Sequence, residues 1–205
     1  MVSAYDNNIS AYVFPYVPPQ DFLPHVEYLN YFSPPECDAL IEVGKRLLPQ
    51  AATVNAGRDV DERMRKSQVS WIGHDQSEYT WIWDKLASLV TMANTRNFHF
   101  TLVGFLEKLQ FTWYSTEGSH YEWHMDYGAG AFSKRKLSLT IQLSDPESYE
   151  GGNLELFYKL QPVVAQRVRG TAILFPSYTM HRVTPLIQGE RCSLVLWASG
   201  VEAYK

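Results

Sequence analysis

The chain has 205 residues, of which 45% are apolar and 20% are charged, a composition typical of a folded globular protein and not of a disordered one. Its net charge of −4 provides no basic surplus, which argues against nucleic acid as the main partner. No apolar run approaches the roughly 18 residues that cross a bilayer, so we expect no membrane partner.

The first hundred residues predict an extended segment followed by a helical support region. Residues 1–30 carry prolines at positions 15, 18, 19 and 24, which prevent a long helix, so we expect extended chain with an edge strand. A helix is predicted over residues 33–48, because Ser33 and Glu36 form a capping box and Pro34 suits the first turn. The charged stretch 55–67 predicts a mobile loop. A second helix is expected over residues 76–94, where an apolar stripe should pack in the core: Tyr79, Ile82, Trp83, Leu86, Leu89, Val90 and Ala93.

After residue 100 the apolar residues recur with a period of two, which is typical of β-strands. Turn signals such as "STEGS", "SDPESYEGG" and "IQGE" separate these runs, and no helical pattern intervenes. Many short strands of this kind favour a sandwich or jelly roll over a parallel sheet. We therefore expect one α+β, mainly β domain over residues 1–205, with the helices of 31–100 packed on a β-sandwich at 101–199. The strands are predicted at 109–114, 136–143, 153–158, 171–175 and 191–198.

The stretch "HYEWHMDYG", residues 120–128, suggests a metal site. On a strand, His124 and Asp126 would point to the same face and reach one ion together. Alone, the pair is a weak signal, and a polar strand edge beside core aromatics is the better interpretation of it. His181, which follows the buried-looking strand "TAILFP", supplies a third candidate ligand. Two imidazoles and one carboxylate leave three octahedral positions open, as in non-haem iron oxygenases, whereas a structural zinc site would close its shell with four ligands.

A candidate anion site follows ten residues after His181. Arg191 opens an apolar strand, and strand alternation places Arg191, Ser193, Val195 and Trp197 on one face. An arginine in such a place needs an anionic partner, and its planar fork suits a carboxylate. The alternative is a surface arginine at a strand end.

Together these motifs resemble the Fe(II)/2-oxoglutarate dioxygenases, specifically the prolyl 4-hydroxylase-like family. The resemblance covers residues 105–199, through "SHYEWHMD", "YEGGNLELF" and "PSYTMHRVTPLIQGERCSLVLWASG". It extends more loosely over residues 30–100 through "RKSQVSWI" and "WIWDKL". It implies a double-stranded β-helix, or jelly-roll, core with N-terminal helices on one sheet.

The resemblance also implies a role for each matching residue. It assigns His124, Asp126 and His181 to iron, and Arg191 with Tyr114 to the distal carboxylate of 2-oxoglutarate. Tyr121 would line the pocket near iron, Trp197 would lie near the distal histidine, and Ser193 would add a hydroxyl group to the carboxylate site. The glycines at 151 and 152 would form a turn between strands.

The implied activity is hydroxylation of a prolyl residue in a peptide or protein, using Fe(II), O2 and 2-oxoglutarate, which is decarboxylated to succinate and CO2; ascorbate is an optional addition. Alternatives are a hydroxylase of a free amino acid or small metabolite, and a non-catalytic binding module of the same fold. The stretches 55–67 and 127–136 are candidate walls over the substrate. The oligomeric state is left open.

We expect a cytoplasmic protein, of bacterial or viral origin. The chain begins without the basic and apolar pattern of a signal peptide. Cys37 and Cys192 have no paired spacing, which favours a reducing compartment.

Overall fold

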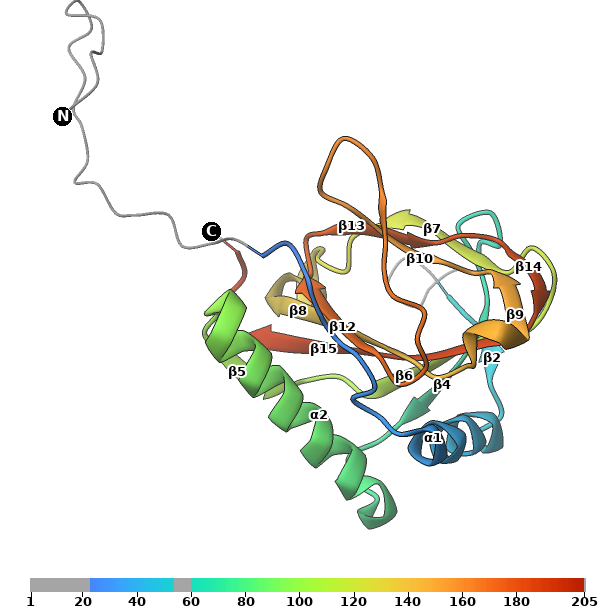
Figure 1. The fold of residues 1–205 in the computed structure, drawn as a ribbon. Coiled ribbons are helices and arrows are strands. Elements are labelled where there is room, and N and C mark those ends of the chain that lie inside the picture. Colours follow the sequence, from blue (N-terminus) through green and yellow to red (C-terminus); the bar gives the residue numbers. More distant parts are fainter. Residues whose placement is uncertain (1–22, 54–59, 205) are drawn as a thin grey trace, which may run out of the picture.

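The computed structural model describes residues 23–53 and 60–204. The extended segment expected at 1–30 therefore falls mostly outside the described residues, as does the centre of the loop expected at 55–67. Figure 1 shows two facing sheets, with both helices beneath the larger sheet. No helix in the described ranges has the length and apolarity that a bilayer crossing needs.

Both predicted helices are present. Helix α1 spans Pro34–Arg46 and begins as expected, because the Glu36 carboxylate accepts the Ser33 backbone N–H at 2.7 Å. Helix α2 spans Thr80–Ala93, between the 3₁₀ turn η1 (Ser77–Tyr79) and the π turn η2 (Asn94–Phe98). The predicted stripe of α2 lies in the core, apart from Trp83, which is only partly buried.

The larger sheet contains eight strands in the described residues, in the order β1-β12-β8-β15-β6-β4-β2, with β5 also paired to β15. All its pairings are antiparallel, which confirms the sandwich expectation over a parallel sheet. The expected N-terminal edge strand is β1. The strands are β1 Val26–Tyr28, β2 Gln50–Ala51, β4 Gln68–Ile72, β5 Leu102–Phe105, β6 Leu109–Tyr114, β8 Arg135–Gln142, β12 Ala172–Pro176 and β15 Arg191–Gly200.

The smaller sheet has five strands in the described part of the chain, in the order β11-β10-β13-β7-β3. A short ladder, β14-β9, closes one end of the sandwich (Figure 1). The turns η3 (Gly130–Lys134) and η4 (Pro146–Ser148) precede β8 and β9. The strands of this sheet are β3 Arg65–Lys66, β7 His120–His124, β10 Leu154–Phe157, β11 Val163–Val164 and β13 Met180–Val183, and those of the ladder are β9 Tyr149–Gly151 and β14 Leu186–Gly189.

Two apolar clusters hold these layers together. The larger one joins the helices to the outer face of the eight-stranded sheet. Its tightest contact is at Gly44 of α1, where an added Cβ would lie 2.2 Å from the Phe111 ring, so only glycine allows this approach. The smaller cluster lies between the two sheets and includes Leu156, Ile173 and Phe175. The space that remains between the sheets contains the candidate site.

Two local predictions need correction. Residues 65 and 66, expected in a mobile loop, form β3 and pair with Tyr121 and His120 of β7. Asp126 is not on a strand, because β7 ends at His124. The prediction that strand alternation brings His124 and Asp126 to one face is therefore wrong, although the two side chains do converge.

Candidate active site

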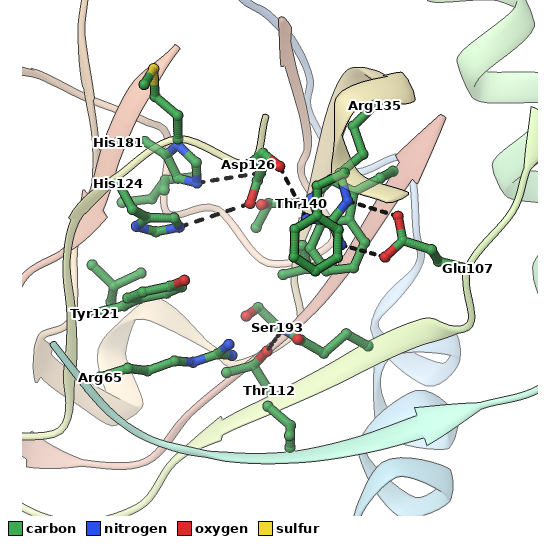
Figure 2. Close-up of a pocket in the computed structure, with 18 of the residues that line it drawn as sticks. Arg65, Glu107, Thr112, Tyr121, His124, Asp126, Arg135, Thr140, His181 and Ser193 are labelled. Carbon is green, nitrogen blue, oxygen red and sulfur yellow. Dashed lines mark hydrogen bonds and ion pairs between the residues drawn. The ribbon is translucent and has the colours of Figure 1, made fainter. Parts of the chain in front are cut away.

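The three predicted metal ligands come together between the sheets. His124 at the end of β7 lies opposite His181 of β13 in the strand register. Asp126 Oδ2 is 3.5 Å from His181 Nε2, and Asp126 Oδ1 is 3.9 Å from His124 Nε2. One ligand atom from each residue lies within 4.8 Å of the others. Figure 2 shows both imidazoles directed at the carboxylate. The geometry suits a single divalent cation with all three protein ligands on one side of it.

Hydrogen bonds to the backbone orient both imidazoles. His124 Nδ1 lies 2.7 Å from the Glu122 carbonyl oxygen, and His181 Nδ1 lies 2.9 Å from that of Thr179. A carbonyl oxygen only accepts, so each Nδ1 carries the proton and each Nε2 presents its lone pair to Asp126. This is the tautomer that a metal ligand needs.

Asp126 is fixed from the neighbouring strands. Its backbone N–H donates to the Ser177 carbonyl at 3.0 Å, which anchors the residue after β7 has ended. Ser138 of β8 donates its hydroxyl to Asp126 Oδ2 at 2.6 Å. The backbone of the turn after β12 and a side chain of β8 therefore do what strand alternation does not.

The protonation states favour cation binding. Burial lowers the pKa of His124 to about 3, and the neighbouring His181 acts in the same direction, so the imidazole is neutral at physiological pH. Burial alone would raise the pKa of Asp126, but the attraction of His181, His124 and Arg135 outweighs it and the net pKa is lowered. A neutral imidazole and an ionised carboxylate are the forms that coordinate divalent metals.

Four side chains form a stacked column on one side of the site, which Figure 2 shows from top to bottom. His181 and His124 have ring centroids 4.1 Å apart, and Tyr121 stacks on His124 at 3.5 Å. The Arg65 guanidinium lies 4.5 Å from the Tyr121 ring centroid, on β3. Tyr121 thus lines the site as predicted, and Arg65 joins it from a segment predicted to be a loop.

Arg191 is a buried cation, with 1% of its surface exposed. Its Nη2 donates to Gln142 Oε1 at 2.8 Å, while its Nε has no partner among the described residues. None of the described carboxylates forms an ion pair with it. Tyr114 lies beside it in the strand register, with the guanidinium 5.2 Å from the Tyr114 ring centroid. The surface-arginine alternative is excluded, and the buried charge fits an anionic ligand.

A glycine makes room for this arginine. Gly152, in the turn after β9, has a φ of +59°, and a Cβ there would lie 3.0 Å from Arg191 Cδ. Gly151 ends β9 and Gly152 begins the short connection to β10, both with a positive φ, and Gly152 also leaves the space that Arg191 occupies.

A cavity of about 690 Å³ joins the metal ligands to Arg191. Its floor is the inner face of the larger sheet, with polar side chains on β6, β8 and β15 (Figure 2). Both predicted walls contribute to the lining, Arg65 from 55–67 and Ala129, Phe132 and Arg135 from 127–136. The volume falls in the range of about 300–1,000 Å³ that is typical of small-molecule sites.

Comparison with known proteins agrees with this geometry. A family model described as the 2OG-Fe(II) oxygenase superfamily matches residues 109–199, the segment that contains the three candidate metal ligands and Arg191. Residues 109–199 are thus similar to the 2OG-Fe(II) oxygenase superfamily. Among curated proteins, a PKHD-type hydroxylase of Synechococcus sp. (strain CC9605) is 38% identical over 91 residues. That alignment covers 44% of this chain and 40% of the relative, so the chain spans about two fifths of the relative's length.

Solved structures extend the likeness beyond the matched oxygenase segment. A Pseudomonas putida prolyl-4-hydroxylase has a TM-score of 0.70 at 21% identity, covering 86% of this chain and 92% of that one. A Trichoplax adhaerens prolyl hydroxylase, in complex with a hypoxia inducible factor oxygen degradation domain peptide fragment, gives 0.69 at 20%, covering 86% and 83%. At such identities the likeness establishes the fold, which confirms the predicted jelly roll with helices on one sheet.

The remaining predicted residues line the cavity. Ser193 Oγ is 3.5 Å from Arg191 Nη1, at the limit of a hydrogen bond. Trp197 packs face to face with the Arg135 guanidinium at 3.7 Å, and its buried Nε1 has no partner in the described ranges. Arg135 is neutralised by Glu107, to which it donates through Nε at 2.7 Å, and it also reaches the Asp126 carbonyl at 3.2 Å.

Several residues of the cavity were not predicted from the sequence. Arg65 was grouped with a solvated charged loop, and nothing in that run distinguishes it. The polar residues of β8 did carry a signal, because Ser138, Thr140 and Gln142 alternate with apolar residues inside a buried strand. His120, expected at the surface, is only 15% exposed, with its ring nitrogens near the carbonyls of Gly118 and Arg63.

Proposed function

We propose that this protein is an Fe(II)- and 2-oxoglutarate-dependent hydroxylase that acts on a prolyl residue in a peptide or protein. One observation carries the proposal. Two imidazoles and a carboxylate converge at one end of a cavity in which a buried arginine lacks a carboxylate partner among the described residues. The donor set suits iron with open positions, and the arginine suits a dicarboxylate cosubstrate.

The residues that would hold each group follow from these contacts. His124, Asp126 and His181 would bind Fe(II). Arg191 would bind the distal carboxylate of 2-oxoglutarate, assisted by the hydroxyl groups of Tyr114 and Ser193. When bound, iron and 2-oxoglutarate would supply the oxidising power for hydroxylation with O2, while 2-oxoglutarate is converted to succinate and CO2.

The chain itself would orient these groups and limit access of water. The carbonyls of Glu122 and Thr179 fix the imidazole tautomers, and Ser138 fixes the carboxylate. Tyr121 and Trp197 add aromatic walls at either side of the metal ligands. The same contacts favour an enzyme over a binding module, because all three candidate ligands are present and aligned.

Two observations bear on the substrate. The P. putida and T. adhaerens structures are prolyl hydroxylases, and the second contains a peptide, which supports a peptidyl-proline substrate. The second candidate, a free amino acid or small metabolite, is favoured by the cavity volume of about 690 Å³, which suits a small molecule.

In either case we propose one functional domain, because the larger apolar cluster joins the helices of 31–100 to the jelly roll.

We also propose that the protein acts in a reducing compartment such as the cytoplasm. Cys37 and Cys192 are both free thiols. Burial raises the pKa of each to about 11, so both are poor nucleophiles for disulfide exchange.

The test is anaerobic titration of Fe(II)-loaded protein with 2-oxoglutarate, followed by visible absorbance. Chelation of the keto acid by open-faced iron should give a charge-transfer band. His181→Ala should abolish the band, whereas His74→Ala, at an exposed histidine outside the cavity, should leave it intact. Wild-type protein that binds iron without forming the band would contradict the cosubstrate assignment. Product analysis with prolyl peptides and free proline, measuring succinate and addition of one oxygen atom, would then separate the two substrate classes.

A further inference from the structure

A second arginine in the cavity also lacks an anionic partner. Arg65 is 7% exposed, lines the cavity and stacks on Tyr121. Its Nε donates to Ser67 Oγ at 3.0 Å, but neither terminal nitrogen has a hydrogen-bond partner among the described residues. No described carboxylate lies within 4 Å of it as an ion pair. The stack and the Ser67 contact hold the guanidinium so that its two-nitrogen fork is free to bind a ligand.

The cavity offers no carboxylate of its own to this fork. Two described carboxylates line the cavity. Glu107 is paired with Arg135, and Asp126 lies between the two imidazoles. Arg191 is the proposed anchor of 2-oxoglutarate. Arg65 therefore remains, within the described part of the chain, a second buried guanidinium without a counter-charge, and such a group favours binding of an anion.

Arg65 is separated from the candidate metal ligand His124 by a single aromatic ring. The Tyr121 ring is sandwiched between the His124 imidazole and the Arg65 guanidinium, at 3.5 Å and 4.5 Å. Figure 2 shows Arg65 extending beneath Tyr121 toward the cavity, near Thr112 of the floor. A ligand bound at the fork would therefore lie one aromatic ring away from a metal ligand. Arg191 enters the cavity from a different sheet, on β15.

We infer that Arg65 is a specificity-determining residue that binds a carboxylate of the substrate to be hydroxylated. The inference rests on the proposed function and narrows its substrate class to molecules with a carboxylate close to the oxidised carbon. That carboxylate belongs either to a free amino acid or to an acidic side chain next to the target residue of a peptide. Both sources share the planar, two-oxygen chemistry that the guanidinium fork matches.

Calorimetric titration of anaerobic Fe(II) protein saturated with 2-oxoglutarate tests the inference. Two pairs of probes differ in the carboxylate alone: L-proline with L-prolinamide, and a blocked Pro-Asp dipeptide with its Pro-Asn counterpart. In at least one pair, wild-type protein should bind the acid about 10- to 100-fold more tightly than the amide. The pair that discriminates identifies the source of the carboxylate.

Variants then assign the preference to Arg65. Arg65→Gln should lose the preference for the acid while binding the amide as before, and Arg65→Lys should retain part of it. Arg63→Gln is the matched control, because Arg63 lies two residues away, is 91% exposed and pairs with Asp61. It should bind both probes like the wild type. Thermal melting of each variant checks that the fold is retained.

Three results would overturn the inference. The first is wild-type protein that prefers the acid in neither pair, which would mean that the fork recognises no carboxylate. The second is an equal loss of acid and amide binding in Arg65→Gln, which would indicate a contact with a carbonyl group or a purely structural role. The third is loss of the 2-oxoglutarate band in Arg65→Gln, which would place Arg65 in the cosubstrate site. Failure of the proposed function is distinct, since wild-type protein would then lack the band while acid and amide binding could still be compared.

Discussion

Strand β15 has two faces with opposite roles. Cys192, Leu194, Leu196 and Ala198 point toward the helices, and each is at most 2% exposed within the larger apolar cluster. Arg191, Ser193, Val195 and Trp197 alternate with them and line the cavity. The first face packs within the larger apolar cluster. On the second face Arg191 Nε and Trp197 Nε1 are buried without a partner in the described ranges.

The difference separates stability from function within one strand. Apolar packing is non-directional and contributes stability roughly in proportion to the area buried. Buried polar groups without partners reduce stability, and they persist where a ligand supplies the missing contact. Substitutions on the helix face should therefore change folding, and those on the cavity face should change ligand binding.

The largest effect is expected from Asp126→Ala. Removal of the carboxylate leaves two imidazoles, which form an incomplete set of ligands, so iron binding and hydroxylation should be lost. Metal retained after desalting measures the loss. The melting temperature of the metal-free variant should stay close to that of the metal-free wild type. A variant that retained one iron per chain would contradict the assignment of the ligands.

On the helix face, Leu194→Ala should lower the free energy of unfolding by about 2–5 kcal/mol, because Leu194 is fully buried and its truncation leaves a cavity. Urea denaturation of the metal-free protein measures this loss. The Leu194→Ala protein that remains folded should still bind iron and 2-oxoglutarate normally. Val195→Ala is the control on the opposite face of the strand, and it should lose less stability. Equal losses would remove the distinction between the two faces.

On the cavity face, we expect Arg191→Met to weaken ligand binding and to leave stability unaffected, the reverse of the effect of Leu194→Ala. Loss of a charge-assisted contact should weaken 2-oxoglutarate binding by about 10- to 100-fold. Stability should be unchanged or higher, because an apolar side chain replaces a buried charge. Band titration and thermal melting measure the two effects. Arg182→Met, which breaks an ion pair with Glu155, is the control and should leave 2-oxoglutarate affinity unchanged. A marked fall in melting temperature for Arg191→Met would indicate that Arg191 is structural.

The smallest effect is expected from Ser138→Ala. This change removes the hydroxyl that donates to Asp126 Oδ2 at 2.6 Å but leaves all three ligands in place. Iron affinity should fall roughly tenfold, which is the lower end for residues that orient a ligand. Competition with a chelator measures it. Ser88→Ala, at an exposed serine of α2, should have no effect. Unchanged affinity in Ser138→Ala would mean that the backbone alone holds Asp126.

The sequence predicted those parts of the fold whose signals are local. The capping box at Ser33 and Glu36 fixed the start of α1, and period-two runs located β6, β8, β10, β12 and β15. Short strands such as β3 and β13 escaped notice, because their pairing depends on residues distant in sequence. Within the site, His124, Asp126 and His181 were found by ligand chemistry. The position of Asp126 beyond the strand depends on Ser177 and Ser138, which no local pattern could reveal.

The space left by Gly152 has a consequence for the choice of cosubstrate. A Cβ at this position would lie 3.0 Å from Arg191 Cδ, so any other residue at 152 would press on the stem of this arginine. Under the proposed function, a displaced guanidinium would alter the span between Arg191 and the metal ligands, and that span has to suit the two carboxylates of a keto diacid. A missing side chain in the connection after β9 would thereby bear on which length of diacid the cavity accepts.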